Sequence, residues 1–263
     1  MELFQYEFMQ RAFLVGTLLA VIIPCIGMTV VLKRLSMMGE SLAHTSLAGV
    51  TFGMILGYNP TLCATLYCVL AALGIELLRK KFPQYAEMAI AIILSAGIGM
   101  TALLSRFVSS SASFQNFLFG SVMAISDFEL GLVATVALLV FLMFVLLYKE
   151  LFYVALDEPA AKLAGVPVGR VNFLFTILTA VTVSIAARTV GALIVSSLLV
   201  IPIACAMRLG KSYRHTVVWA MLISLFATDF GLYLSYYTRT PPGGTIVMVE
   251  ITLLLFLLLL PQK

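Results

Sequence analysis

The sequence contains few charged residues. Only 11% of its 263 residues are Asp, Glu, Lys or Arg, whereas 62% are hydrophobic and the mean hydropathy is +1.10. Soluble domains keep about a quarter of their residues charged, so this chain lacks the charge to cover a surface in water. No stretch is long and polar enough to form a separate soluble domain. The composition predicts one transmembrane domain over residues 1–263, surrounded by membrane lipid.

Several motifs are also absent. There is no Gly-x-x-x-x-Gly-Lys-Ser/Thr loop, so the chain cannot hydrolyse nucleotide by that route, and we expect no catalytic site. The single Trp and the scattered basic residues form no basic stripe with interleaved aromatics, which argues against nucleic acid as a partner. No basic leader or small-residue cleavage site accompanies the first apolar run. The four cysteines form no Cys-x-x-Cys pair and are expected to be buried hydrophobes: Cys25, Cys63, Cys68 and Cys205.

Long apolar runs dominate the rest of the chain. A helical crossing needs about 20 residues, and hydropathy predicts nine such spans: 11–32, 42–57, 60–80, 85–105, 127–148, 171–187, 189–207, 213–235 and 243–260. The apolar piece 114–125 is too short to cross and is expected to be re-entrant or interfacial. The prediction is an all-α polytopic membrane protein with about nine transmembrane helices.

The basic residues predict the orientation. With nine crossings and the N-terminus outside, twelve of the sixteen basic residues face the cytoplasm: Lys33, Arg34, Arg79, Lys80, Lys81, Lys149, Lys162, Arg170, Arg208, Lys211, Arg214 and Lys263. The four outside are Arg11, Arg106, Arg188 and Arg239. Cytoplasmic loops carry an excess of Lys and Arg, so we expect the N-terminus outside and the C-terminus in the cytoplasm.

Glu40 and His44 are the first candidate functional residues. They are four residues apart at the start of an apolar segment, which places them about 40° apart on one helix face. Both are costly groups in hydrocarbon, so each needs a partner. Spacing alone favours an ordinary helix-start arrangement, with Glu40 near the N-terminal dipole.

The glycines of the same span favour a functional role instead. Gly49, Gly53 and Gly57 recur at intervals of four and predict a close-packing seam on nearly the opposite face. One side of the helix is then expected to pack on a neighbour while Glu40 and His44 line a path. A carboxylate and an imidazole suit zinc, manganese or ferrous iron. Two copies of the chain would supply two Glu and two His, enough for a four-coordinate site.

Two further acids lie within predicted spans. Asp229 and Glu250 are each expected to be satisfied hydrogen-bond partners between helices, with a place in the ion path as the alternative. His215, beside Arg214 at an inner helix start, is expected to be interfacial. Small residues beginning at Gly191 favour close helix packing in the run 188–204.

The longest polar stretch, 156–170, has the pattern of a short capped helix. Asp157 is a candidate N-cap, Pro159 suits the first turn, Gly165 suits a left-handed stop, and Pro167 prevents continuation. A helix of two turns has little stability alone, so we expect it to be held against this protein or a cytoplasmic partner.

Four segments together resemble the permease subunit of zinc/manganese-type ABC importers. They are 38–50 (Met-Gly-Glu-Ser-Leu-Ala-His-Thr-Ser-Leu-Ala-Gly-Val), 118–122 (Leu-Phe-Gly-Ser-Val), 157–168 (Asp-Glu-Pro-Ala-Ala-Lys-Leu-Ala-Gly-Val-Pro-Val) and 190–202 (Val-Gly-Ala-Leu-Ile-Val-Ser-Ser-Leu-Leu-Val-Ile-Pro). The similarity runs over nearly the whole chain and is greatest to the zinc-uptake branch. It implies a type II-importer-like ABC permease in the cell membrane of a prokaryote.

The resemblance also implies partners and roles. Two permease chains would form the channel, two cytoplasmic ATPase subunits would bind ATP and drive it, and an extracytoplasmic protein would deliver the metal; the chain would hold no permanent cofactor. The inner loop would dock on the ATPase through a set of seven residues: Asp157, Glu158, Pro159, Lys162, Leu163, Gly165 and Pro167. Position 40 is usually Asp in this family, and Glu40 extends the carboxylate by one methylene, which would alter the coordination geometry.

Two other classes compete with this interpretation. A stand-alone secondary transporter or channel would need several paired intramembrane charges, often in inverted repeats, and the sequence has few such charges and no convincing repeat. An intramembrane metalloenzyme would need His-Glu-x-x-His or an equivalent cluster, whereas the chain has only two histidines.

Overall fold

The computed structural model describes residues 6–82, 84–108 and 125–259. Within these ranges the regular elements are all helices: α1 (Glu7–Leu32), α2 (Met38–Leu56), α3 (Pro60–Lys81), α4 (Ala86–Ser105), α6 (Asp127–Leu146), α7 (Tyr148–Leu156), α8 (Glu158–Leu163), α9 (Val168–Thr189), α10 (Ala192–Leu209), α11 (Tyr213–Thr238) and α12 (Pro242–Leu259). The all-helical class predicted from composition is confirmed. The segment 114–125 lies outside the described residues, apart from Ile125.

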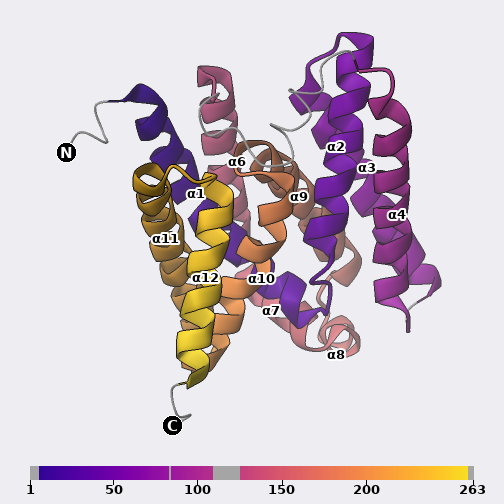
Figure 1. Cartoon of the computed structure of the whole chain (residues 1–263). Helices are drawn as coiled ribbons and strands as arrows, with labels where there is room; N and C mark the ends of the chain where they lie inside the picture. Colours follow the sequence, from indigo (N-terminus) through magenta and orange to yellow (C-terminus); the bar gives the residue numbers. More distant parts are fainter. Residues whose placement is uncertain (1–5, 83, 109–124, 260–263) are drawn as a thin grey trace.

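The helices form two groups joined by α6 and α9 (Figure 1). On one side, α2 packs chiefly against α3 and α4. On the other, α11 packs against α1, α10 and α12. Helix α10 belongs to the second group but also contacts α2, so it separates α2 from α11 and α12. Most of the buried core lies along these contacts, in one continuous apolar cluster.

Capping residues explain several helix boundaries. The Asn59 side chain accepts a hydrogen bond from the Thr61 amide and begins α3, with a proline in the first turn. Ser126 and Glu129 form a reciprocal capping box that begins α6. Between α9 and α10, Gly191 has φ +112°, a conformation that favours glycine. The position predicted for packing thus breaks the chain between two helices.

Seven of the described helices are long and apolar enough to cross a membrane: α1, α3, α4, α6, α9, α11 and α12. Each of the nine predicted spans coincides with one helix, and the two outside this set are α2 and α10. Polar residues, including Glu40 and His44, make α2 less apolar. The apolar part of α10 is short, Ile194–Leu209.

Apolar side chains cover much of the outer surface. On α3, exposed leucines repeat along one face at positions 62, 66, 70 and 77. On α12 only three residues are buried, Gly243, Ile246 and Glu250. Such surfaces are stable against lipid or another apolar chain but not in water.

Candidate metal site and coupling segment

Glu40 and His44 lie one turn apart near the start of α2. Glu40 is in the first turn, and both side chains are half-buried. Within the described part of the chain, neither side chain makes a hydrogen bond or ion pair. Glu40 does lie near the N-terminal end of the helix dipole, as the helix-start interpretation expects, but no side-chain hydrogen bond among the described residues caps the helix.

The glycines of α2 pack against α3 at two of the three predicted positions. A Cβ at Gly49 would lie 2.7 Å from the Ala64 Cα, and a Cβ at Gly53 would lie 3.1 Å from the Pro60 Cα. Gly57 does not continue this seam. It ends α2 in the left-handed conformation with φ +72°, and a Cβ there would meet nothing within 4 Å. The physical reason is that the chain turns into the 57–59 connection, where glycine is needed for its backbone.

Two other faces of α2 are also occupied. A Cβ at Gly39 would lie 2.5 Å from the Leu199 Cδ1 of α10, and a Cβ at Gly97 of α4 would lie 2.8 Å from the Thr45 Oγ1. At about 100° per residue, Glu40 and His44 lie on the arc between the α10 and α4 contacts, opposite α3. That arc presents a carboxylate and an imidazole that the described chain only half covers.

One chain does not complete a metal site. Among the described residues, no three His, Cys, Asp or Glu side chains are grouped so that they could hold an ion. Glu40 and His44 would supply two ligands, whereas a site for zinc or manganese needs at least four donors in total. The remaining donors have to come from water, the cargo's carrier or a second chain.

Asp229 is bonded to a neighbouring helix. The Thr17 hydroxyl of α1 donates to its Oδ1 at 3.2 Å, which joins α1 and α11. Because α11 packs on α1, α10 and α12 rather than on α2, the structure does not bring Asp229 to the Glu40 turn. This contact is the hydrogen bond between helices that was expected for Asp229.

Glu250 is fully buried on α12, but in the described part of the chain it lacks the hydrogen bond between helices that was expected for it. Neither of its carboxylate oxygens has a hydrogen-bond partner within the described residues. Ser197 of α10 lies close enough to interact with it, and the Ser197 hydroxyl itself donates to the Ile194 carbonyl at 2.7 Å. Glu250, like Asp229, is not brought to Glu40 and His44.

His215 lies in the first turn of α11. Its side chain is exposed, and its backbone amide donates to the Ser212 side chain that caps the helix. This exposed position at a helix start matches the interfacial place expected from the sequence.

The predicted capped helix is α8. The Asp157 Oδ1 accepts from the Ala160 amide at 3.0 Å, and Pro159 lies in the first turn. Gly165 has φ +85°, and its amide donates to the Lys162 carbonyl while the Val166 amide donates to the Ala161 carbonyl. This pair of bonds is the Schellman arrangement that ends helices. Pro167 then precedes α9 directly.

An exposed apolar surface accompanies α8. Leu163 is 91% exposed at the end of the helix, and Leu156 and Tyr153 of α7 are also exposed nearby in the chain. Only Ala161 of α8 is buried. We call these residues of α7 and α8 the α8 surface.

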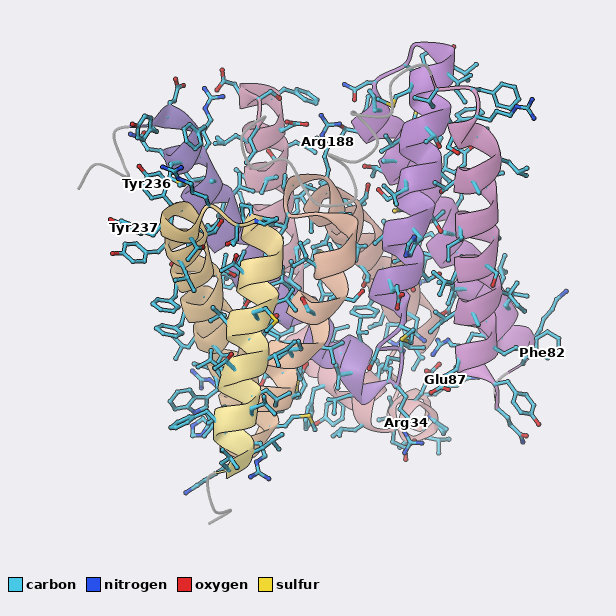
Figure 2. The ribbon with its side chains drawn as sticks, viewed as in Figure 1. Arg34, Phe82, Glu87, Arg188, Tyr236 and Tyr237 are labelled. Carbon is cyan, nitrogen blue, oxygen red and sulfur yellow. The ribbon has the colours of Figure 1, made fainter. Side chains whose placement is uncertain are left out.

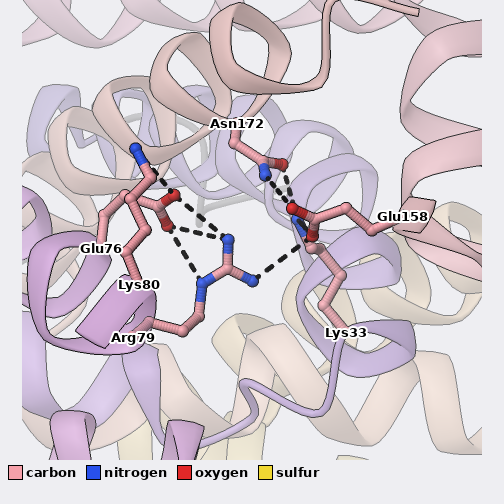
Figure 3. A network of polar contacts seen from close by, with 6 residues as sticks. All are labelled: Lys33, Glu76, Arg79, Lys80, Glu158 and Asn172. Atoms are coloured by element: carbon pink, nitrogen blue, oxygen red, sulfur yellow. Dashed lines mark hydrogen bonds and ion pairs between the residues drawn. The ribbon is translucent and has the colours of Figure 1, made fainter. Parts of the chain in front are cut away.

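Behind the α8 surface lies a network of polar contacts (Figure 3). Glu158 of α8 faces Lys33 and Arg79, and Asn172 of α9 bonds both Lys33 and Glu158. Glu76 pairs with Arg79 at 3.0 Å. Burial lowers the pKa of Lys33, and the positive charge of Arg79 lowers it further, while Glu158 and Glu76 act in the opposite direction. The network joins the end of α1, the end of α3, α8 and α9.

Sequence reasoning missed most of this network. Lys33 and Arg79 were counted only as markers of orientation, and Glu158 only as part of the coupling segment. The spacing of three between Glu76 and Arg79 was a usable sign of a helical ion pair. Nothing local in the sequence identifies Asn172, because its partners are far away along the chain.

The opposite end of the molecule has its own ion pairs. Arg11 of α1 bonds Asp127 of α6 at 2.8 Å and the Ile125 carbonyl at 3.0 Å. Arg188 of α9 bonds Glu129 of α6. Figure 2 shows Arg188 at the end remote from Arg34 and Glu87, which lie near α8. Two basic residues predicted to share one membrane face, Arg11 and Arg188, thus both pair with the start of α6.

These features define a polytopic membrane protein with a half-buried carboxylate and imidazole one turn apart on α2 and a capped helix at one end. A family model described as the ABC 3 transport family matches residues 5–261. The chain belongs to that family, and the prediction of a metal-transport ABC permease is confirmed at the level of the family. Such a permease is the membrane component of its system and not itself an enzyme.

Curated relatives match almost end to end. A protein of Treponema pallidum (strain Nichols) named "Probable metal transport system membrane protein" is 32% identical over 98% of this chain and 97% of its own length. A Listeria monocytogenes protein named "Manganese transport system membrane protein MntC" is 31% identical over 97% and 91%. A Haemophilus influenzae protein named "High-affinity zinc uptake system membrane protein ZnuB" is 28% identical over 92% and 94%.

A solved structure has the same fold. It is described as PsaBC from Streptococcus pneumoniae in complex with Fab, and it matches with a TM-score of 0.88 at 24% identity, over 99% of this chain and 94% of the other. The ABC permease fold expected from the sequence is therefore confirmed, whereas its details of crossing number and orientation are not fixed by this likeness.

Proposed function

We propose that this protein is the permease subunit of an ATP-driven importer that carries a divalent transition metal ion through Glu40 and His44. The observation that carries the proposal is the half-covered arc of α2, where two metal-binding side chains lie one turn apart without a partner in the described chain. Two copies related by a two-fold axis would bring two carboxylates and two imidazoles together. A site assembled from two subunits can open when they move, which suits transient binding during transport.

The orientation we propose has nine crossings, the N-terminus outside and the C-terminus in the cytoplasm. It is supported by the end of the molecule that holds α8, which also carries the basic residues Lys33, Arg34, Arg79 and Lys80. An excess of Lys and Arg marks the cytoplasmic side. In a prokaryotic cell membrane, this orientation turns the α8 surface toward the cytoplasm and α6 with Arg11 and Arg188 toward the extracytoplasmic binding protein.

The α8 surface is the proposed docking site for the ATPase subunit. It presents an almost fully exposed leucine on a helix of six residues, Glu158–Leu163, and its caps fix that helix in place. An exposed apolar side chain on a rigid element is typical of a contact with another protein. ATP would bind to the partner subunit, and the permease would contribute movement only.

For the cargo we propose zinc first and manganese second. Imidazole ligands suit zinc, and carboxylate ligands suit manganese. Ferrous iron is bound by both kinds of ligand. The Haemophilus relative is named for zinc uptake, and the Listeria relative is named for manganese transport. Glu40, in place of the more usual Asp, is the residue through which this chain's choice would differ from that of its relatives.

The stand-alone transporter is the weaker candidate. Membership of an ABC family argues for separate ATPase subunits. Co-purification separates the two: an ABC ATPase that binds the chain supports the importer, and ATP-independent uptake by the chain alone supports the rival.

The test is metal uptake by the reconstituted complex of permease, ATPase and binding protein in liposomes, with Zn²⁺ and Mn²⁺ each supplied alone. We expect ATP-dependent uptake that falls at least ~10-fold in Glu40→Ala and in His44→Ala, since each removes half of the protein ligands. Glu87→Gln is the matched control, because Glu87 is exposed at the start of α4 and makes no contact within the described residues. Uptake at the wild-type rate in both ligand variants contradicts the proposal.

A further inference from the structure

Glu158 connects α8 to three other helices. Its Oε2 lies 3.5 Å from the Lys33 Nζ and 3.7 Å from the Arg79 Nη1, and its Oε1 accepts from the Asn172 Nδ2 at 3.0 Å. Lys33 in turn donates to the Asn172 Oδ1 at 2.6 Å. One carboxylate thus faces the end of α1, the end of α3 and the first turn of α9 (Figure 3).

The partners of Glu158 are held more firmly than Glu158 itself. The side chains of Lys33 and Arg79 are 6% and 15% exposed, whereas that of Glu158 is 40% exposed. Arg79 is also fixed by Glu76, which accepts bonds at 3.1 and 3.2 Å from its guanidinium. Glu158 is therefore more exposed than either of its two charged partners, and it is the member of the network that lies on α8.

The network continues directly into α2. Lys33 is the C-cap of α1, and only residues 34–37 separate it from Met38, the first residue of α2. Backbone hydrogen bonds close this short connection: the Leu35 amide donates to the Val30 carbonyl, and the Met38 amide donates to the Leu35 carbonyl. Met38 lines a small cavity together with Lys33, Arg79 and Asn172.

A displacement of Lys33 would thus be passed to the first turn of α2, where Glu40 lies. The start of α2 is also packed against α10 through Gly39. A shift there changes the angle at which Glu40 and His44 face a second chain, because helices move as rigid elements over short distances.

We propose that Glu158 is the residue that transmits movement of α8 to the Glu40 and His44 turn, through its charge pairing with Lys33 and Arg79. This inference rests on the proposed function, since it assumes that α8 docks on an ATPase and that the turn carries metal. It adds a specific positioning residue and its route, and it separates the two tasks of α8: the α8 surface binds the partner, whereas Glu158 connects that surface to the metal path.

Glu158→Gln tests the charge and keeps the shape. A glutamine still accepts the Asn172 hydrogen bond through its amide oxygen, but it cannot pair with Lys33 and Arg79. The Asp157 cap and the Schellman turn are unchanged, so α8 itself is expected to remain. The control is again Glu87→Gln, the same chemical change at an exposed position near the same end of the molecule (Figure 2).

The experiment measures ATP hydrolysis and Zn²⁺ uptake in the same liposomes containing the full complex. We expect Glu158→Gln to bind the ATPase and to hydrolyse ATP, but to carry about five-fold less metal per ATP, an effect in the range of a partly exposed charge network. Glu158→Asp keeps the negative charge that faces Lys33 and Arg79 and is expected to retain part of the ratio that Glu158→Gln loses. A thermal unfolding scan of each variant reports whether the fold persists.

The outcomes are distinguishable. If wild-type complex carries neither Zn²⁺ nor Mn²⁺ with ATP, the proposed function itself fails. If wild type transports and Glu158→Gln has the same metal-to-ATP ratio, the function stands and the transmitting role of Glu158 is overturned. If Glu158→Gln loses the ATPase from the complex, Glu158 is a docking residue, which also overturns this proposal.

Discussion

At the scale of single residues, Glu40 is the position that we propose decides metal choice. Glu40→Asp shortens the carboxylate by one methylene without changing its charge or the half-buried site. Because geometry selects among divalent metals more than raw affinity does, we expect the ratio of Zn²⁺ to Mn²⁺ uptake to change by at least ~3-fold. Competition uptake in liposomes measures this ratio. The same ratio in Glu40→Asp and wild type would show that Glu40 does not contact the cargo.

Glu250 is a second residue whose chemistry can be tested. A buried carboxylate without a partner is costly when charged. Glu250→Gln keeps the shape and removes the ionisable group, so we expect thermal stability equal to or above that of wild type. Glu250→Ala leaves a cavity at the α10–α12 contact and should lower stability by ~2–4 kcal/mol. Thermal unfolding in detergent compares them, and strong destabilisation by Gln would show that the charged form is required.

These two residues also show what the sequence can and cannot specify. Glu40 and His44 were found because four-residue spacing directly gives a shared helix face. The lack of a hydrogen-bond partner for Glu250 among the described residues was not predicted, because the available partners depend on which helix packs opposite it. Asn172 and Lys33 were missed as partners for the same reason: their contact joins positions 139 residues apart.

At the scale of elements, α2 and its neighbour α3 depend on the absence of side chains at their contact. A Cβ at Gly49 would lie 2.7 Å from both the Ala64 Cα and the Cys63 carbonyl oxygen, and neither backbone atom can rotate away. We expect Gly49→Ala to destabilise the protein by ~1–3 kcal/mol. Gly131→Ala on α6 is the matched control, since nothing lies within 4 Å there, and it should be neutral or stabilising by up to ~1 kcal/mol. Equal unfolding temperatures for the two variants contradict the packing account.

The caps of α8 predict a separate effect on partner binding. Gly165 has φ +85°, which costs a residue with a Cβ about 1 kcal/mol. Gly165→Ala should therefore weaken ATPase binding about five-fold, while Gly169→Ala, in open space at the start of α9, should leave it unchanged. A titration of the ATPase against labelled permease measures both affinities. Identical affinities for the two variants would mean that the shape of α8 does not matter for docking.

Element boundaries followed the sequence where capping chemistry is local. Asp157, Gly165 and Pro167 identified α8 from neighbouring residues alone. Gly57 was misassigned because a glycine repeat cannot reveal where the helix ends: its spacing fits the seam, but its backbone turns out of the helix. Helix α7 was not predicted as a separate element: the predicted span 127–148 ends where α7 begins, and nothing in the apolar composition marks the break at Leu147.

At the scale of the whole molecule, the fold separates three tasks. Helix α2, packed between α3, α4 and α10, carries the turn proposed to bind metal. Helix α8 lies at the end proposed to meet the ATPase, and α10 separates the turn from α11 and α12. The exposed apolar faces of α3, α6 and α12 require lipid or a second apolar surface. Composition predicted this membrane setting, but no property of a single sequence states which exposed face meets a second copy.

The central claim is that Glu40 and His44 from two chains bind the metal in transit. X-ray absorption spectroscopy on the Zn²⁺-loaded permease–ATPase complex tests it most directly, with metal content measured on the same samples. The account predicts mixed oxygen and imidazole-nitrogen ligation with one ion per two permease chains, and loss of the imidazole contribution in His44→Ala. An unchanged spectrum and metal content in both His44→Ala and Glu40→Ala would contradict it.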